Sequence, residues 1–145
     1  MNLPKIIPIF PLSNFIIFPE TTVPLNIFEP RYIDMINDCM KSDKLIGMIQ
    51  PKKTKNNNYQ PTDLYKIGCL GKITSFKEIE NNQYLIELKG LIRFEITQEK
   101  ESNKKYRLCE INFQNYLEDL DIKNKNLQFS DLKLIFKDLK SLFEK

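Results

Sequence analysis

The residue types of this chain exclude the commonest forms of side-chain catalysis. It contains no histidine, so a Ser-His-Asp triad, a Cys-His pair and histidine-bearing zinc sites are ruled out. Serine-lysine chemistry would need a desolvated lysine beside an activated serine, but the serines fall mostly in expected turns or helix caps. No carboxylate pair can be placed at glycosidase spacing, and the run Glu118, Asp119 and Asp121 indicates solvated surface. We therefore predict no catalytic residue and no enzymatic activity.

The cysteines Cys39, Cys69 and Cys109 each fall within an apolar pattern, which favours buried inert thiols over reactive ones. Their odd number and wide spacing argue against a disulfide framework and against a zinc site. Residues 68–72 (GCLGK) superficially resemble a phosphate loop, but Ile73 stands where a serine or threonine would hold magnesium, so a bent strand is the better interpretation. We expect no metal site, no cofactor and a reducing, cytoplasmic compartment.

The charges of the chain are interleaved, with 22 basic residues, 19 acidic residues and a formal net charge of +3. This balance permits nucleic-acid binding without implying it. Lys52, Lys53 and Lys55 lie near Tyr59 and could contact phosphates while the tyrosine stacks on a base. A lysine run in an asparagine-rich segment is, however, more often a solvated loop.

The length and composition indicate one globular domain. The chain has 145 residues, of which 41% are hydrophobic and 28% charged, and roughly two-thirds of the unfolded surface can be buried at this length. The apolar amino terminus is interrupted by Pro4, Pro8 and Pro11 and lacks a small-residue cleavage signal. It therefore predicts a strand rather than a signal peptide or a membrane span, and we expect no membrane association.

The first half of the chain predicts short strands and one helix. Apolar runs between residues 6 and 27, including FIIF at 15–18, indicate strands joined by tight turns, with prolines at edges or bulges. Pro30 stands at the first position of a helix that is expected to end near Ser42. Residues 45–50 then indicate a buried strand, and residues 51–63 a surface loop.

The second half predicts longer strands followed by a helix. Strands are expected at residues 65–79, 84–100 and 106–113, with Gly90 at a bulge or bend of a barrel. Ser130 is a suitable N-cap for an amphipathic helix whose apolar stripe runs to Phe143. The barrel, a dimer partner or a further helix would have to cover this stripe. The sequence leaves open the oligomeric state and whether the natural chain continues beyond Lys145.

Several segments resemble the amino-terminal substrate-binding domain of Lon-type proteases. That family has a P-L-x-x-x-x-x-x-P-G-x-x-x-P-L pattern leading into a short helix, and residues 27–32 (IFEPRY) have the form usual in its small bacterial stand-alone members. Residues 63–73 and 88–96 are similar to later strands of the family. Glu20 departs from the pattern, because the family commonly has glycine there, and glutamate disfavours the positive φ of a tight turn. This chain matches the proline-leucine pattern of the family at Pro11, Leu12, Pro19, Pro24 and Leu25.

The resemblance implies an α+β, mainly β fold: a PUA-like, closed or partly open β-barrel of about six strands with a short inserted helix. We expect this barrel to span residues 1–115, and a helical carboxyl-terminal extension to span residues 116–145. In full-length Lon proteases, unfolding and cleavage belong to ATPase and protease domains whose Walker motif and Ser-Lys dyad are not found in this sequence. The resemblance therefore implies a non-catalytic module that recognises protein or peptide segments, with a protease or a chaperone as a further partner.

We expect the binding site beside residues 27–32, called here the corner. It would need an exposed apolar patch or an open strand edge, rimmed by a few charges. The candidates are Phe28, Pro30 and Tyr32 for the patch, Glu29 and Arg31 for the rim, and Arg93 on a neighbouring strand.

Two alternatives stay open. The corner could be structural, with Phe28 and Tyr32 fixing the helix to the barrel while Glu29 and Arg31 pair with each other or with backbone. The chain could also bind RNA, because PUA-like folds resemble known RNA-binding modules. Similarity of fold alone is weak evidence for a shared function.

Overall fold

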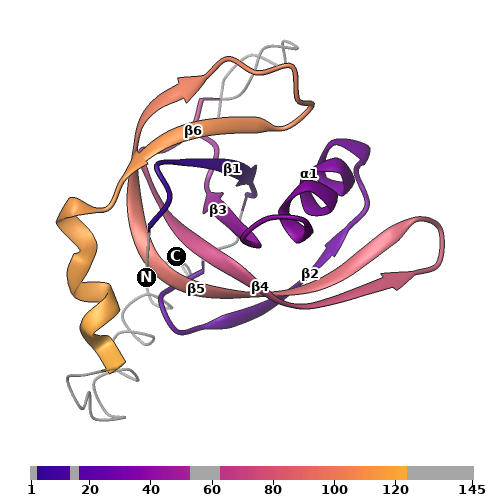
Figure 1. Cartoon of the computed structure of the whole chain (residues 1–145), viewed down its shortest axis with the longest axis horizontal. Helices are drawn as coiled ribbons and strands as arrows, with labels where there is room; N and C mark the ends of the chain where they lie inside the picture. Colours follow the sequence, from indigo (N-terminus) through magenta and orange to yellow (C-terminus); the bar gives the residue numbers. More distant parts are fainter. Residues whose placement is uncertain (1–2, 14–16, 53–62, 124–145) are drawn as a thin grey trace.

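A computed structural model of the chain describes residues 3–13, 17–52 and 63–123. Its fold is mainly β, as the sequence predicts, with one α-helix inserted between strands (Figure 1). Residues 53–62 of the loop predicted at 51–63, and the predicted helix after Ser130, lie outside the described residues. The elements in chain order are β1 (Ile6–Pro11), β2 (Thr22–Ile27), α1 (Pro30–Met40), β3 (Leu45–Ile49), β4 (Ile67–Ile79), β5 (Gln83–Lys100), β6 (Arg107–Asn112) and the 3-10 helix η1 (Gln114–Lys123).

The strand β5 organises the sheet because it has different neighbours along its length. The order is β2-β5-β4-β3-β1-β6, and an additional pairing of β5 with β6 closes the barrel on one side. The first part of β5 pairs with β2, and its last part pairs with β6. Among the described strands, β2 pairs with β5 alone, so the barrel is only partly closed. Pro24 lies in this edge strand, where a missing N–H is tolerated.

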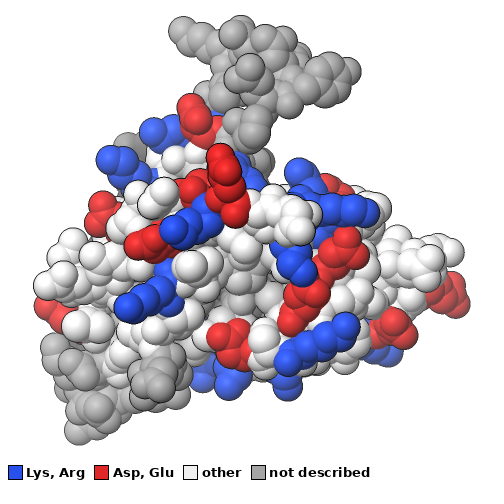
Figure 2. Space-filling model, turned by 45° about the horizontal axis from the view of Figure 1, so that its top comes forward, with Lys and Arg blue, Asp and Glu red and all other residues white. Residues whose placement is uncertain are grey.

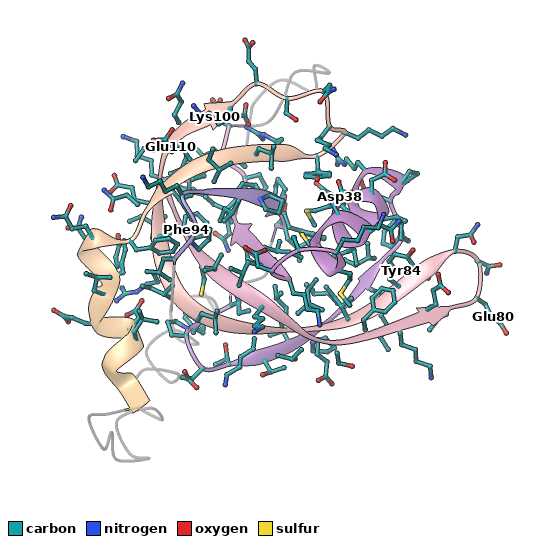
Figure 3. The ribbon with its side chains drawn as sticks, viewed as in Figure 1. Asp38, Glu80, Tyr84, Phe94, Lys100 and Glu110 are labelled. Atoms are coloured by element: carbon teal, nitrogen blue, oxygen red, sulfur yellow. The ribbon has the colours of Figure 1, made fainter. Side chains whose placement is uncertain are left out.

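The alternation of apolar residues in β5 produces the core. Ile86, Leu88, Ile92 and Phe94 are buried, whereas Leu85 and Glu87 are exposed. A strand places successive side chains on opposite faces, so one face of β5 points inward. Figure 3 shows Phe94 within the barrel, and Tyr84 at the far end of the strand near α1.

Gly90 marks the predicted bend of β5, although the strand continues through it. The register of β5 against β4 shifts between Leu70 and Gly71, which pair with Ile92 and Gly90, so that Leu91 is an extra residue. An inserted residue of this kind bends a strand and increases its twist. The bend therefore lies where β5 passes from β2 towards β6.

The helix α1 covers the open side of the barrel. Pro30 begins it, and its buried face consists of Tyr32, Met35, Ile36 and Cys39. Two side-chain hydrogen bonds hold it: the hydroxyl of Tyr84 donates to Asn37 over 2.8 Å, and that of Tyr106 donates to Asp38 over 2.5 Å. The helix ends at Met40 with Lys41 as its C-cap, close to the predicted end.

The expectation that FIIF forms a strand is wrong for its described residues, because Ile17 and Phe18 lead into a tight turn. The N–H of Thr21 donates to the carbonyl of Phe18 over 3.1 Å, with Pro19 at the second position of the turn. Glu20 follows with φ 68°. This is the pattern of a type II turn, in which the third residue needs positive φ. The turn thus forms despite the glutamate.

Glu20→Gly should give a higher free energy of unfolding than Glu20→Ala, by about 1 kcal/mol. Both variants lose the ion pair between Glu20 and Lys89, whose charged atoms lie 3.4 Å apart. Only alanine retains a Cβ at positive φ, so the difference measures the relief of backbone strain, reduced by the larger entropy that glycine gives the unfolded chain. Urea denaturation of the two variants measures it, and equal stabilities would contradict the proposed strain.

Candidate functional site

An apolar pocket of about 560 Å³ opens between the end of β3 and the beginning of β4. Its walls combine segments that are far apart in the sequence: the loop before β2, the end of β3, the start of β4 and one residue of β5. A concave, mostly apolar surface with a few polar groups is the usual form of a binding site. The lining residues are Ile17, Phe18, Met48, Ile49, Gln50, Lys52, Tyr65, Lys66, Ile67, Gly68, Cys69 and Arg93.

One pocket wall is held in place by the backbone of Gly90. Its N–H donates to the carbonyl of Thr21, and its carbonyl accepts from the N–H of Glu20, each over 2.8 Å. A methyl group at Gly90 would lie 2.0 Å from the carbonyl oxygen of Phe18. Only glycine permits this approach, which brings Ile17 and Phe18 against the barrel.

The side of the pocket nearest the core is apolar and chemically inert. A methyl group at Gly68 would lie 2.3 Å from the carbonyl oxygen of Met48, so β3 and β4 approach closely here. Cys69 is buried, and burial, followed by the charge of Asp119, raises its pKa to about 12. The thiol therefore remains protonated at neutral pH, as the inert interpretation of the sequence requires.

The pocket mouth carries two exposed apolar side chains. Tyr65 is 51% exposed and Ile67 is 53% exposed. The N–H of Tyr65 donates to the carbonyl of Gln50 over 3.0 Å, and the ammonium of Lys52 lies 5.8 Å from the centre of the tyrosine ring. Lys53, Lys55 and Tyr59, which the sequence associates with Lys52, lie outside the described residues.

Arg93 is fixed at the pocket by η1. The Nε and backbone N–H of Arg93 donate to Oδ2 of Asp119 over 3.0 and 2.9 Å, and Nη2 donates to Oδ1 over 2.9 Å. The guanidinium also lies 4.8 Å from the ring centre of Tyr116. The hydrogen bond to Asp119 raises the pKa of Arg93. This bidentate pair attaches η1 to β5.

The solvated interpretation of the acidic run is wrong for Asp119, whose side chain is 7% exposed. The sequence shows Asp119 among charged neighbours, and its partner lies 26 residues away. One local signal could have indicated the burial of Asp119. Tyr116 and Leu120, three residues before it and one residue after it, are partly buried and pack on the core. The predicted domain boundary between residues 115 and 116 stays a prediction.

The corner divides into buried and exposed residues. Tyr32 is buried and stacks on Phe10 with ring centres 4.4 Å apart, whereas Phe28 is 62% exposed. Burial raises the pKa of Tyr32. Glu29 and Arg31 form an ion pair of 3.0 Å, and the Arg31 guanidinium lies 4.7 Å from the Tyr32 ring centre. Pro30 begins α1 and is exposed.

The structure does not bring Arg93 to the corner. The corner follows β2, whose last residue, Ile27, pairs with Tyr84 of β5. Arg93 lies nine positions beyond Tyr84, roughly 30 Å along the strand. Of the residues expected to bind protein segments, Arg93 alone lines the pocket, together with Lys52, which the sequence suggests as a phosphate contact. The sequence pattern did not indicate Ile17, Tyr65 or Ile67 as site residues.

Two structural findings bear on other classes of function. Within residues 3–13, 17–52 and 63–123, no group of histidine, cysteine and acidic side chains is arranged to hold a metal ion. None of the helices in that part of the chain is long and apolar enough to cross a membrane. Figure 2 shows basic and acidic side chains beside one another across the face in view, rather than one basic area.

The described residues thus form a partly open, mainly β barrel with an apolar surface pocket, which is the kind of concave surface that binds ligands. The chain belongs to the family described as the ATP-dependent protease La (LON) substrate-binding domain, which matches residues 6–145. The expected family membership and the mainly β barrel fold are thus confirmed.

Known relatives are much longer than this chain. It is 27% identical over 97 residues to Lon protease 2 of Myxococcus xanthus, covering 67% of this chain and 12% of that protein. It is 31% identical over 93 residues to Lon protease of Desulfosudis oleivorans, covering 63% of this chain and 11% of that protein. The chain therefore corresponds to a small part of these proteases.

Solved structures show the same fold. A Lon N-terminal domain protein from Xanthomonas campestris superposes with a TM-score of 0.60 and 21% identity, covering 76% of this chain and 60% of that one. The N-terminal domain of Mycobacterium avium complex Lon protease gives a TM-score of 0.58 and 14% identity, covering 75% of this chain and 54% of that one.

Asp119→Ala should lower the free energy of unfolding by about 2 kcal/mol, because it removes charge-assisted hydrogen bonds and leaves the backbone N–H of Arg93 unpaired. The half-exposed guanidinium can be rehydrated, which keeps the loss below that of a fully buried pair. Urea denaturation measures the change. Glu118→Ala, an exposed neighbouring substitution, should stay within about 0.5 kcal/mol of the wild type, and an equal loss in both variants would contradict the assignment.

Proposed function

We propose that this chain captures exposed apolar segments of other proteins in the pocket between β3 and β4. The observation that carries the proposal is the pocket itself, which combines an apolar lining with the exposed side chains of Tyr65 and Ile67 at its mouth. Burying one large aliphatic or aromatic side chain contributes about 1.5–3 kcal/mol. A segment that places such a side chain in the pocket would therefore gain useful affinity.

The family membership supports the same function, because the matching domain is described as substrate-binding. In this proposal the captured segment belongs to a substrate or partner protein, and the chain itself performs recognition without chemistry. Delivery to a protease or a chaperone would be a separate step carried out by those partners.

The pocket is a better site than the corner for this purpose. Tyr32 packs its ring on Phe10 and is buried, so it offers little surface to a ligand. Glu29 and Arg31 pair with each other, which is the structural role considered for them from the sequence. Phe28 is left as the exposed apolar side chain of the corner, and it serves as the comparison site in the following experiment.

Tyr65→Ala and Ile67→Ala should each weaken binding of a fluorescently labelled apolar peptide by about tenfold, because each shortens the apolar contact by one side chain. Fluorescence anisotropy with the full chain measures the dissociation constants. Both residues are about half exposed, so the variants should keep the wild-type thermal unfolding midpoint.

Leu117→Ala is the matched control, since Leu117 is 50% exposed but lies on η1 outside the pocket lining. It should bind like the wild type. Weakened binding in Phe28→Ala, with Tyr65→Ala and Ile67→Ala unaffected, would move the site to the corner and disprove the pocket proposal.

Salt separates this function from RNA binding. Capture of an uncharged apolar peptide should stay constant or strengthen as salt rises, whereas phosphate binding weakens steeply. Binding to a mixed RNA pool that is tight at low salt and lost at high salt, together with no peptide binding, would favour the RNA alternative.

A further inference from the structure

The charged side chains that line the pocket are all basic. Its lining includes Lys52, Lys66 and Arg93 but neither aspartate nor glutamate. Within the described part of the chain, no carboxylate lies within ion-pair distance of Lys52 or Lys66. Four other lysines of the described residues are paired, Lys89 with Glu20, Lys100 with Glu110, Lys104 with Asp38 and Lys105 with Asp34, whereas Lys72 and Lys77 of β4 have no such partner in an ion pair.

Arg93 retains hydrogen-bonding capacity despite its carboxylate partner. Asp119 accepts from its Nε and Nη2, and the side chain is 51% exposed. A guanidinium has five N–H donors, so the Nη1 group can still donate to an incoming acceptor. Asp119 and Tyr116 limit the movement of the side chain, which lowers the entropy lost when it binds a ligand.

The cations lie on different segments around an apolar cavity. Lys52 follows β3, Lys66 precedes β4, and Arg93 lies on β5 opposite Cys69. Apolar walls reduce the local dielectric constant, so positive charges at such a rim attract anions more strongly than the same charges on an open surface. Because the cations are spread around the mouth, they suit several acidic groups along a ligand better than a single terminal carboxylate.

We propose that the pocket selects apolar protein segments flanked by aspartate or glutamate side chains. This inference rests on the proposed function of the pocket and adds the charge of its ligand. The apolar side chain enters the cavity, and the flanking carboxylates meet Lys52, Lys66 and the outer edge of Arg93. Segments flanked by lysine or arginine are disfavoured by the same charges.

A set of labelled peptides with one apolar core and different flanks tests the proposal. Each peptide carries glutamate, glutamine or lysine on both sides and has an amidated carboxyl terminus. Fluorescence anisotropy at about 0.15 M salt should give binding roughly tenfold tighter for the glutamate peptide than for the glutamine peptide, with the lysine peptide weakest. The glutamate advantage should disappear near 1 M salt, where screening acts within about 3 Å.

The double variant Lys52→Gln, Lys66→Gln should reduce the glutamate advantage, measured as the ratio of the dissociation constants of the glutamine and glutamate peptides, to about twofold. The matched control is Lys72→Gln, Lys77→Gln, which removes two exposed lysines of β4 outside the pocket lining and should preserve the advantage. Equal loss in both double variants would show a general charge effect and overturn the assignment to the rim.

The outcomes distinguish this inference from the function on which it rests. Equal binding of the glutamate and glutamine peptides, with both weakened by Ile67→Ala, would overturn the acidic preference and leave apolar capture intact. The acidic preference would also be overturned if the flanking glutamates gave no advantage and the glutamine peptide bound more tightly once its terminal amide was replaced by a free carboxylate. The pocket would then recognise the carboxyl terminus of a chain. Binding of none of the peptides would contradict both proposals.

Discussion

The structure depends on one constraint: β5 must bend between Gly90 and Phe94 so that a single strand can pair first with β2 and then with β6. The extra residue Leu91 in the register against β4 makes this bend possible. An extra residue of this kind bends the strand, so that its last part can reach β6. Further register shifts lie between Ile73 and Ser75 of β4 and between Ile96 and Gln98 of β5, so closure of the barrel depends on backbone geometry as well as on the apolar pattern.

The same segment also positions the pocket. Gly90 holds the loop that carries Ile17 and Phe18, and Arg93, three residues further along, anchors η1 while it lines the rim. Substitutions within this part of β5 would change folding and binding together. Tyr65, Lys66 and Ile67 are exposed and belong to the segment that leads into β4, so their side chains can be changed without altering the residues of the bend itself.

The sequence predicts those features that depend on local patterns. The alternation of Ile86, Leu88, Ile92 and Phe94 indicates the strand, and Pro30 indicates the start of the helix, because each signal concerns neighbours in the chain. The pocket could not be predicted in this way, since its walls come from segments that meet only after the barrel closes. Asp119 was misjudged for the same reason: its local surroundings are charged, and the partner that explains its burial is on another element.

The residues of the first family pattern, together with Tyr32, mostly have structural roles. The later segments that resemble the family, residues 63–73 and 88–96, include Tyr65, Ile67 and Arg93 of the pocket. Pro19 lies in the turn before β2, Pro24 lies in the edge strand, and Tyr32 packs on Phe10. These positions belong to the barrel and its helix, so this part of the resemblance identifies the architecture without specifying what it binds. The exposed residues of the pocket mouth make no comparable contribution to the core. Differences in ligand preference between barrels of this kind can therefore arise at the pocket mouth. They would come from the size of an apolar side chain or from the sign of a charge at the rim, while the barrel stays the same.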